Sequence, residues 1–456
     1  MKKKKLISLG LAAAMTVSLL TACGGKENKE ASAPTDGKVQ IEYWHTMAGV
    51  NGEAMESLVN QFNETVGEEK GITVKSVYQG DDVSEKLKTL AQTNDTKNFP
   101  DVAQIVGAGV PSAMGYEQLV TMEDMYAKGN DITVAKEDLD PHSVRAFSYQ
   151  DELICMPFNV SSILLYYNKD MFEEAGLDPE NPPETIADMA DACEKLLVKD
   201  GDTVTRYGLN VAVRRYQLAN WIGGQGEYNF FGNNEGGRSG MMTEVTFGDD
   251  GTLDKYLTEW QKVIDTGAYK EVEDNINEEF SMGLFGMAIM SSARIGTINS
   301  LVGDKFEWAT APLPKVDAAD TGGTSVGGSC LAMFDKGSEE QVDASWIFTQ
   351  YLASPEAQIA FDTATGYLPV NTKVYDEADM QTYMEENPNY ATAVEQMQNS
   401  HVNVQEPFDI INWELDEIIK NNMAEFAAGN QDKDTTCSNI VEQCNTKLAD
   451  YARANG

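Results

Sequence analysis

Histidine, the residue that most often acts as a general acid or base in enzymes, is scarce in this chain of 456 residues. There are three histidines, His45, His142 and His401. The sequence contains no zinc-protease motif, nucleophile elbow, phosphate-binding loop, dinucleotide fingerprint or calcium loop. The 73 acidic residues make chance pairs of carboxylates common, and glycoside hydrolysis needs two carboxylates at a fixed separation in space. The residue types therefore favour ligand binding, and a secreted carbohydrate-active enzyme is the alternative.

Arginines are scarce in this acidic chain, which has only seven of them. Arg214 and Arg215 are adjacent, and Arg294 follows an apolar run that we expect to be a buried strand. A guanidinium can hold a phosphate or carboxylate through two parallel hydrogen bonds. These three arginines are therefore candidates for an anion site, and the alternative is that they pair with the many carboxylates around them.

Three further candidates lie at or just after the ends of the first two predicted strands. Trp44 could stack on the face of a sugar, and His45 could donate a hydrogen bond; the alternative is a core tryptophan beside a surface histidine. Asp82 could bind two adjacent hydroxyl groups of a polyol, although it could equally cap the helix that starts at Val83.

The elements that must position these residues alternate between strand and helix. Period-two and period-3.6 patterns predict strands over 39–44, 72–78, 102–106, 207–213, 286–290, 306–311 and 330–334, and helices over 53–62, 83–91, 216–222, 252–264, 339–351, 354–363, 391–399, 410–427 and 435–453. This alternation is typical of α/β lobes in which helices cover a mainly parallel sheet.

The prediction of the fold starts from the segment 154–197, which reads as a strand followed by two helices. Ile163 to Tyr167 is an unbroken apolar run, as expected for a strand that is buried on both faces of a mainly parallel sheet. Asp170 can cap the helix that follows, and Pro182 and Pro183 are placed to open a second helix. The polar, kinked stretch 157–162 before the strand suits a passage from one lobe to another.

Three segments resemble a known family. PFNVSSILLYYNKDMF, EEAGLDPENPPET and TGYLPVN, in this order, are similar to the solute-binding proteins of bacterial ABC importers, especially the carbohydrate and glycerol-3-phosphate-binding lipoproteins. The resemblance runs from about Ile41 to about Asn371. It implies a two-lobed periplasmic-binding-protein fold of type II, with a ligand cleft at the hinge and no chemistry performed on the ligand. A surface adhesion or sensory module on the same fold is a further alternative.

The resemblance also points to site residues. Ser161 matches a ligand-contacting serine of the family motif, Gly328 a backbone contact, and Tyr367 a cleft tyrosine. Arg214 and Arg215 fall where the family has cleft aromatics, and Arg294 falls in a loop that supplies contacts. Trp221, like Tyr216 and Trp413, would suit a saccharide.

The chain also departs from the glycerol-3-phosphate pattern. Asp82 and Gly107 stand where the family has a tyrosine and a glutamate, and the late arginine that should hold the phosphate has no counterpart. No basic residue occurs from Asn403 to Glu417. Either one of the three arginines takes over this role, or the ligand is a neutral sugar or oligosaccharide.

By analogy with the family, the chain crosses between lobes near Phe158, near Val326 and between Tyr367 and His401. We therefore expect an N-lobe of 39–158 plus 327–370, a C-lobe of 159–326 plus 400–456, and a connecting segment of 371–399.

The N-terminal residues resemble the signal of a bacterial lipoprotein. Four lysines at 2–5 precede an apolar stretch, and the run Leu20-Thr21-Ala22-Cys23 matches a lipoprotein cleavage box. This predicts a signal peptide over 1–22, a lipidated Cys23 and a flexible tether over 23–38. We expect a monomer that is anchored to the outer face of the cell membrane and delivers its ligand to an ABC permease.

The overall charge excludes some classes of binding partner. A formal charge of −39 argues against nucleic acid and against an acidic membrane surface as a partner. Besides Cys23 there are five cysteines, which is an odd number with no zinc-ligand spacing. We expect them to be small buried apolar residues, and no cofactor or metal is predicted.

Overall fold

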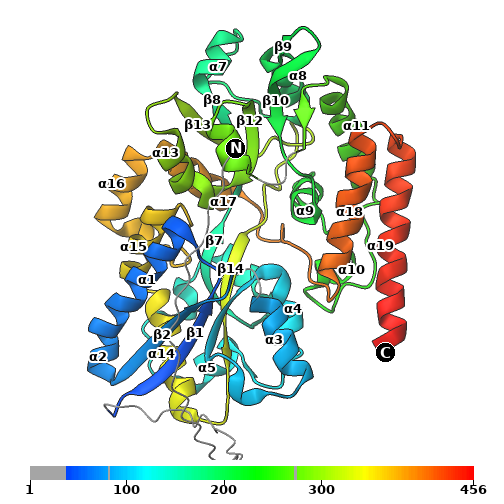
Figure 1. Cartoon of the computed structure of the whole chain (residues 1–456). Coiled ribbons are helices and arrows are strands. Elements are labelled where there is room, and N and C mark those ends of the chain that lie inside the picture. Colours follow the sequence, from blue (N-terminus) through cyan, green and yellow to red (C-terminus); the bar gives the residue numbers. More distant parts are fainter. Residues whose placement is uncertain (1–36, 81–82, 272–274, 456) are drawn as a thin grey trace, which may run out of the picture. The chain divides into compact units, whose positions relative to one another are not determined.

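The computed structural model describes residues 37–80, 83–271 and 275–455. Two six-stranded sheets dominate it (Figure 1). In the first sheet the strands run in the order β2 (Ile72–Tyr78), β1 (Val39–His45), β3 (Val102–Val106), β14 (Gly327–Phe334) and β4 (Leu119–Val120), and β7 (Met156–Ser161) also pairs with β14. The parallel strands β1, β2 and β3 end at the same edge of this sheet.

The second sheet follows the order β11 (Tyr269–Lys270), β10 (Thr203–Asn210), β12 (Phe285–Ser291), β8 (Ile163–Asn168) and β13 (Trp308–Pro312), and β9 (Val198–Asp200) pairs with β10. Both sheets are mixed, whereas the sequence predicted mainly parallel ones. The strand β8 is antiparallel to β12 and to β13. It is nevertheless buried on both faces, because Leu164 and Tyr166 join one apolar core while Ile163, Leu165 and Tyr167 join another.

Helices cover the first sheet on both sides. The helices α1 (Gly49–Glu64) and α14 (Glu339–Leu352) lie on one side, and α3 (Val83–Gln92) and α4 (Val110–Ala113) lie on the other (Figure 1). The apolar stripe of α1, which consists of Met55, Leu58, Val59 and Phe62, faces the core. This is the burial expected of an amphipathic helix.

One face of the second sheet packs against α8 (Ile186–Leu196) and α11 (Thr252–Asp265), with α18 (Asn412–Ala427) and α19 (Lys433–Asn455) beyond them. The other face packs against α12 (Ile276–Ser281), α13 (Ile295–Val302) and α17 (Pro388–Asn399). The helix α8 begins at Ile186, where Thr185 and Asp188 form a capping box. The prediction that Pro182 and Pro183 open this helix is therefore wrong.

The helix α7 (Lys169–Glu174) directly follows β8, and Asn168, rather than the predicted Asp170, caps it. The side-chain oxygen of Asn168 accepts a hydrogen bond from Met171 N at 2.9 Å. Asp170 lies within the first turn, where its carboxylate interacts favourably with the positive end of the helix dipole.

The chain passes from the first sheet to the second at Ser162. Asn159, Val160 and Ser161 belong to the first sheet, since β7 pairs with β14 up to the pair Ser161 and Gly327. The passage therefore lies a few residues later than the predicted crossing at Phe158. The return runs through 313–326, between β13 and β14. After α17, the segment 400–411 leads to α18.

The five cysteines in the described part of the chain form no disulfide, and four of them are buried: Cys155, Cys193, Cys330 and Cys444. This confirms the prediction of small buried apolar residues for these four, whereas Cys437 is half-buried. None of the described helices is long and apolar enough to span a bilayer.

Candidate functional site

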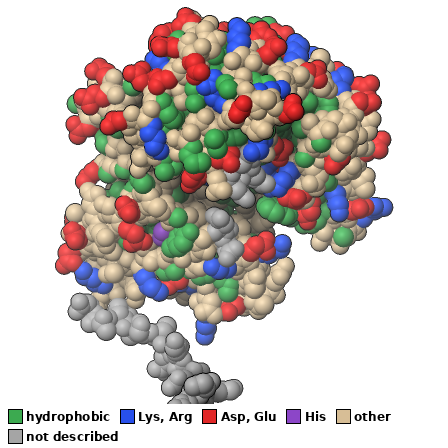
Figure 2. All heavy atoms as spheres, turned by 45° about the horizontal axis from the view of Figure 1, so that its top comes forward, with side chains coloured by type: hydrophobic (Ala, Val, Ile, Leu, Met, Phe, Trp, Pro, Cys, Tyr) green, Lys and Arg blue, Asp and Glu red, His purple; other side chains and the backbone are tan. Residues whose placement is uncertain are grey.

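The edge where β1, β2 and β3 end presents apolar side chains to solvent. Tyr78 at the end of β2 is 56% exposed, and Val106 at the end of β3 is 50% exposed. A groove of about 940 Å³ begins at the ends of β1 and β2 and continues along α1, and its lining includes Met47, Glu56 and Tyr78. Figure 2 shows a hollow in one face of the molecule with hydrophobic side chains exposed on its borders. An exposed aromatic ring beside a groove can stack on a ligand.

The structure places the predicted Trp44 inside the first lobe. It is 8% exposed, and its Nε1 donates a hydrogen bond to Glu42 Oε1 at 2.6 Å. The exposed aromatic residue at this edge is Tyr78, which was not among the residues predicted from the sequence. The signal that could have found it is its place as the last residue of a strand that runs parallel to β1.

His45 is also buried, but it shapes the groove. Its ring lies between those of Tyr43 and Tyr78, at centroid distances of 5.6 and 5.8 Å. The Nδ1 atom accepts a hydrogen bond from Met47 N, and Nε2 lies 3.5 Å from Glu56 Oε1. Burial lowers the pKa of this imidazole, which favours its neutral form. Asp82 lies outside the described residues.

Ser161 and Gly328 come together where β7 pairs with β14. Gly328 has a φ of +95°, and a Cβ on it would lie 2.2 Å from Asn159 O, so only glycine fits here. A Cβ on the neighbouring Gly327 would lie 3.2 Å from Ser161 Oγ and 2.4 Å from Tyr216 Oη. The two hydroxyl groups therefore adjoin the same stretch of glycine backbone.

Tyr367 joins this group from the loop after α15 (Pro355–Thr365). The next residue, Leu368, forms a bridge with Val160 of β7, which fixes the position of the tyrosine. The Tyr367 hydroxyl lies 3.9 Å from Met47 Sδ in the groove. Burial raises the pKa of Tyr367, while its contacts with Asn159 and the charge of Arg294 act in the opposite direction.

Asn159 is held in place by the first sheet. Its Oδ1 accepts a hydrogen bond from Gln104 Nε2 at 2.9 Å, and Gln104 Oε1 in turn accepts one from Thr46 N. This chain of amides connects β7 to β3 and to the loop after β1. It orients the Asn159 side chain beside Tyr367. Asn159 was not predicted as a site residue, although it lies within the motif that contains Ser161.

Arg294 follows β12 in the short helix η5 (Ser292–Arg294). It is exposed, and its side chain makes no hydrogen bond or ion pair with any residue in the described part of the chain. Its charge acts on Tyr367 and Tyr166. We use the name hinge site for Asn159, Ser161, Gly328, Arg294 and Tyr367.

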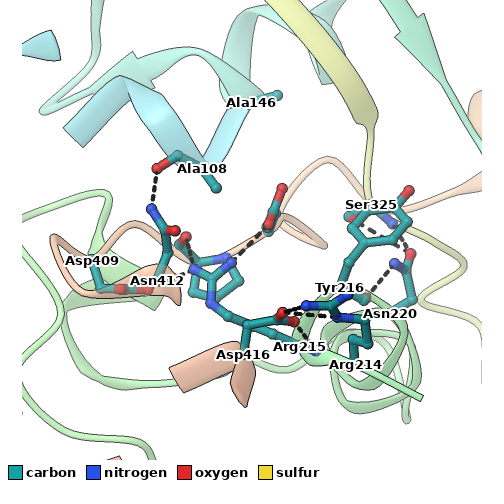
Figure 3. Close-up of polar contacts among 12 residues, drawn as sticks. Ala108, Ala146, Arg214, Arg215, Tyr216, Asn220, Ser325, Asp409, Asn412 and Asp416 are labelled. Atoms are coloured by element: carbon teal, nitrogen blue, oxygen red, sulfur yellow. Dashed lines mark hydrogen bonds and ion pairs between the residues drawn. The ribbon is translucent and has the colours of Figure 1, made fainter. Parts of the chain in front are cut away.

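Arg215, in contrast, is paired with carboxylates of the protein itself (Figure 3). It is the first residue of α9 (Arg215–Gly223), and its guanidinium contacts Glu406 Oε1 at 2.7 Å, Asp409 Oδ2 at 2.6 Å and Pro407 O at 2.7 Å. Burial raises the pKa of both carboxyl groups, and the arginine charge opposes this shift. The buried charges therefore offset one another, although Arg215 Nε and Asp409 Oδ1 have no hydrogen-bond partner among the described residues.

Arg214 pairs with α18 of the same lobe. Its Nε donates to Asp416 Oδ2 at 2.8 Å, and Nη2 lies 3.5 Å from Glu417 Oε1. Arg214 and Arg215 thus follow the alternative given for the three arginines, which is that they pair with nearby carboxylates and do not form an anion site. Only Arg294 of the three predicted arginines has no carboxylate partner among the described residues.

Trp221 lies in the core of the second lobe. It is 2% exposed, it stacks on Tyr256 at a centroid distance of 5.0 Å, and its Nε1 donates to Pro314 O. Its edge lines a separate cavity of about 470 Å³ together with Thr324 and Gln396. Those two residues contact Ser162. This cavity therefore adjoins the passage between the two sheets at Ser162.

Trp413 is the exposed tryptophan, with 65% of its surface accessible. The preceding residue, Asn412, donates a hydrogen bond to Ala108 O at 2.7 Å, just after β3 (Figure 3). This contact brings the start of α18 to the edge where the parallel strands end. Among the described residues there is no cluster of side chains that could hold a metal ion.

Comparisons with known proteins agree with this arrangement. Residues 57–392 match the family of bacterial extracellular solute-binding proteins. The chain belongs to this family. It is 26% identical over 433 residues to the sn-glycerol-3-phosphate-binding periplasmic protein UgpB of Rhizobium meliloti. The matched region covers 90% of this chain and 94% of that protein. It is 28% identical to UgpB of Escherichia coli K12 over 367 residues, which covers 79% and 80% of the two chains.

Solved structures show the same fold. UgpB of Mycobacterium tuberculosis in complex with glycerophosphocholine superposes with a TM-score of 0.74 at 21% identity, covering 91% of this chain and 100% of that one. The sugar-binding protein MalE of Xanthomonas citri gives 0.73 at 20% identity, covering 91% and 99%. The predicted α/β fold of the two-lobed periplasmic binding proteins is confirmed, and so is family membership. This solute-binding protein acts outside the cytoplasm as the substrate-binding component of an ABC importer, and it is not an enzyme.

Proposed function

We propose that this solute-binding protein captures a polyol phosphate, such as glycerol 3-phosphate or a glycerophosphodiester, and presents it to an ABC permease. The observation that carries the proposal is Arg294, an exposed guanidinium without a partner among the described residues, beside Tyr367. In a protein with a formal charge of −39, such a cation attracts an anionic ligand group. The relatives that match most of the chain's length carry glycerol-3-phosphate in their names.

The rest of the hinge site supplies groups that suit such a ligand. The hydroxyl groups of Ser161 and Tyr367 can donate or accept hydrogen bonds, and the Asn159 amide can donate. The close approach of β7 and β14 at Gly328 keeps side chains away from the middle of the site. A phosphate at Arg294 would thus leave polar partners for the glycerol hydroxyl groups, which is how a binding site rejects analogues that lack them.

A neutral saccharide is the second candidate. Tyr78 and Trp413 expose aromatic rings at the edge where the parallel strands end, and aromatic faces stack on sugar rings. The structural neighbour MalE is described as sugar-binding. In this case Arg294 would donate hydrogen bonds to hydroxyl groups instead of holding a phosphate.

Thermal unfolding and calorimetric titration of residues 38–456 would separate the two candidates. The probes are glycerol 3-phosphate, glycerophosphocholine and maltotriose. At about one hundred times its Kd, a ligand should stabilise the protein by roughly 2.7 kcal/mol. Binding of the two phosphates and not of maltotriose is the expected result. Preference for maltotriose would favour the second candidate, and failure to bind any probe would contradict the proposal.

We also propose that the two lobes, approximately 39–158 plus 327–370 and 159–326 plus 400–456, close on the ligand, and that 371–399 connects them. The support is the passage of the chain between the two sheets at Ser162 and through 313–326. Small-angle scattering should show a smaller radius of gyration after the ligand is added. An unchanged radius at saturating ligand would contradict closure.

The N-terminal sequence supports a further proposal, that Cys23 carries lipid and tethers a monomeric domain to the membrane. Metabolic labelling with a fatty acid should mark the wild-type protein, whereas Cys23→Ala should be unlabelled and found in the medium. Equal labelling of both proteins would contradict the anchor, and sedimentation of the soluble domain as a dimer would contradict the monomer.

A further inference from the structure

Glu406 is a carboxylate whose two oxygen atoms have different surroundings. Its Oε1 accepts the hydrogen bond from Arg215, whereas its Oε2 lies 3.7 Å from the position that a Cβ on Gly107 would occupy. About 19% of the side chain is exposed. Gly107 directly follows β3, at the edge where the parallel strands end. One oxygen is thus fixed by the second lobe and the other faces the first.

The protein holds this carboxylate firmly. Its partner Arg215 is itself anchored by Asp409 and by the carbonyl of Pro407. The backbone of Glu406 is fixed as well, because Glu406 O accepts a hydrogen bond from Arg238 Nη2 at 2.9 Å. Arg238 is buried and also donates to Ala146 O in the first lobe. The Glu406 carboxylate is therefore preorganised.

Tyr216 connects Glu406 with the hinge site. The charge of Glu406 acts on Tyr216, whose hydroxyl lies next to the backbone of Gly327 beside Ser161. The hinge site itself contains the cation Arg294, and Tyr216 beside it is within reach of the charge of Glu406. A carboxylate oxygen can only accept hydrogen bonds, so it attracts hydroxyl or ammonium groups and repels phosphate.

We infer that Glu406 is a specificity-determining residue, which receives the hydroxyl or cationic end of the ligand through Oε2 while Arg294 receives the anionic end. Arg215 is its positioning residue. This inference rests on the proposed function, because it assumes a ligand with an anionic group and a hydrogen-bond-donating group.

The test is calorimetric titration of Glu406→Gln with glycerol 3-phosphate, glycerophosphocholine and maltotriose. Glutamine keeps one oxygen for Arg215 but can present an amide donor where the carboxylate presented an acceptor. We expect at least tenfold weaker binding of the probe that the wild type binds best. The control is Glu174→Gln, which removes a carboxylate that pairs with Arg206 at 2.8 Å in the second lobe and should leave binding unchanged.

A second variant tests the inference even if Glu406→Gln fails to fold. Gly107→Ala leaves the ion pair intact, and its Cβ makes only ordinary contacts, at 3.6 Å to Phe147 and 3.7 Å to Glu406 Oε2. It should weaken binding because the methyl group occupies the space before Oε2. Gly109→Ala is the matched control, since its Cβ would face Ser84 and Ile105.

The outcomes separate this inference from the proposed function. If the wild type binds a probe and both Glu406→Gln and Gly107→Ala bind it equally well, the role of Glu406 is wrong while the proposed function stands. If the wild type binds none of the three probes, the proposed function fails and this inference fails with it.

Discussion

Arg215 and Arg294 show how differently one residue type can be used within the same lobe. Arg215 is 3% exposed and meets two carboxylates and a carbonyl. Arg294 is exposed and meets none among the described residues. In so acidic a protein most guanidinium groups neutralise nearby carboxylates. The comparison teaches that an arginine is informative about a ligand only when the fold leaves its hydrogen-bond donors unused.

The largest effect should come from breaking the buried cluster. Arg215→Ala leaves Glu406 and Asp409 with unpaired charge, which should lower the free energy of unfolding by about 3–5 kcal/mol. Urea denaturation measures this, with Arg453→Ala as control because Arg453 pairs only with the exposed Asp450 among the described residues. A loss below about 1 kcal/mol in Arg215→Ala would show that the cluster is not a structural unit.

Arg294→Ala should lower the affinity for ligand and leave the stability of the fold almost unchanged. The free energy of unfolding should change by less than about 0.5 kcal/mol, as for other exposed side chains. Affinity for the phosphate probes should fall roughly 10- to 100-fold, the value of a hydrogen-bonded charge. Calorimetric titration checks this, and unchanged affinity would remove Arg294 from the binding site.

Asp362 extends the comparison to a buried ionisable group without an ion-pair partner in the described part of the chain. Its carboxyl group has no hydrogen-bond partner among the described residues. Burial raises its pKa well above the ordinary value. The folded protein therefore keeps a proton that the unfolded chain loses, and the free energy of unfolding falls as pH rises above about 4.

Asp362→Asn should flatten this pH dependence. At pH 8 it should be more stable than the wild type by about 1 kcal/mol or more, and the difference should vanish near pH 3, where aspartate is protonated in both states. Urea denaturation at several pH values measures the slope. Parallel curves for the two proteins would contradict the raised pKa.

The smallest effect should come from Arg294→Lys. Lysine keeps the charge but loses the planar fork that holds two phosphate oxygens at once. Affinity for the phosphate probes should fall only about threefold to tenfold, less than in Arg294→Ala. Equal losses in both variants would show that fork geometry, and not charge, governs the interaction.

The sequence predicted most elements well but not how they pair. The strands over 72–78 and 102–106 agree with β2 and β3 residue for residue, because local periodicity sets them. The antiparallel pairing of β8 was not predictable in this way. Its neighbours β12 and β13 lie more than a hundred residues away in the chain, and a run of apolar residues carries no information about direction.

The site was harder to predict than the fold, because exposure depends on distant contacts. Trp44, Trp221 and Trp413 looked alike in the sequence, yet only Trp413 is exposed. The partners of Arg215 lie about 190 residues later in the chain. The family motif did bring Ser161, Gly328 and Tyr367 to one place, since Val160 of β7 pairs with Gly328 and bridges to Leu368.

The most direct test of the whole account is a crystal structure of residues 38–456 with the probe that binds most tightly. We predict electron density for the ligand beside Ser161, Gly328 and Tyr367, with its phosphate on Arg294. Density in the cavity beside Trp221 and Gln396, or a ligand that does not touch Arg294, would contradict the account.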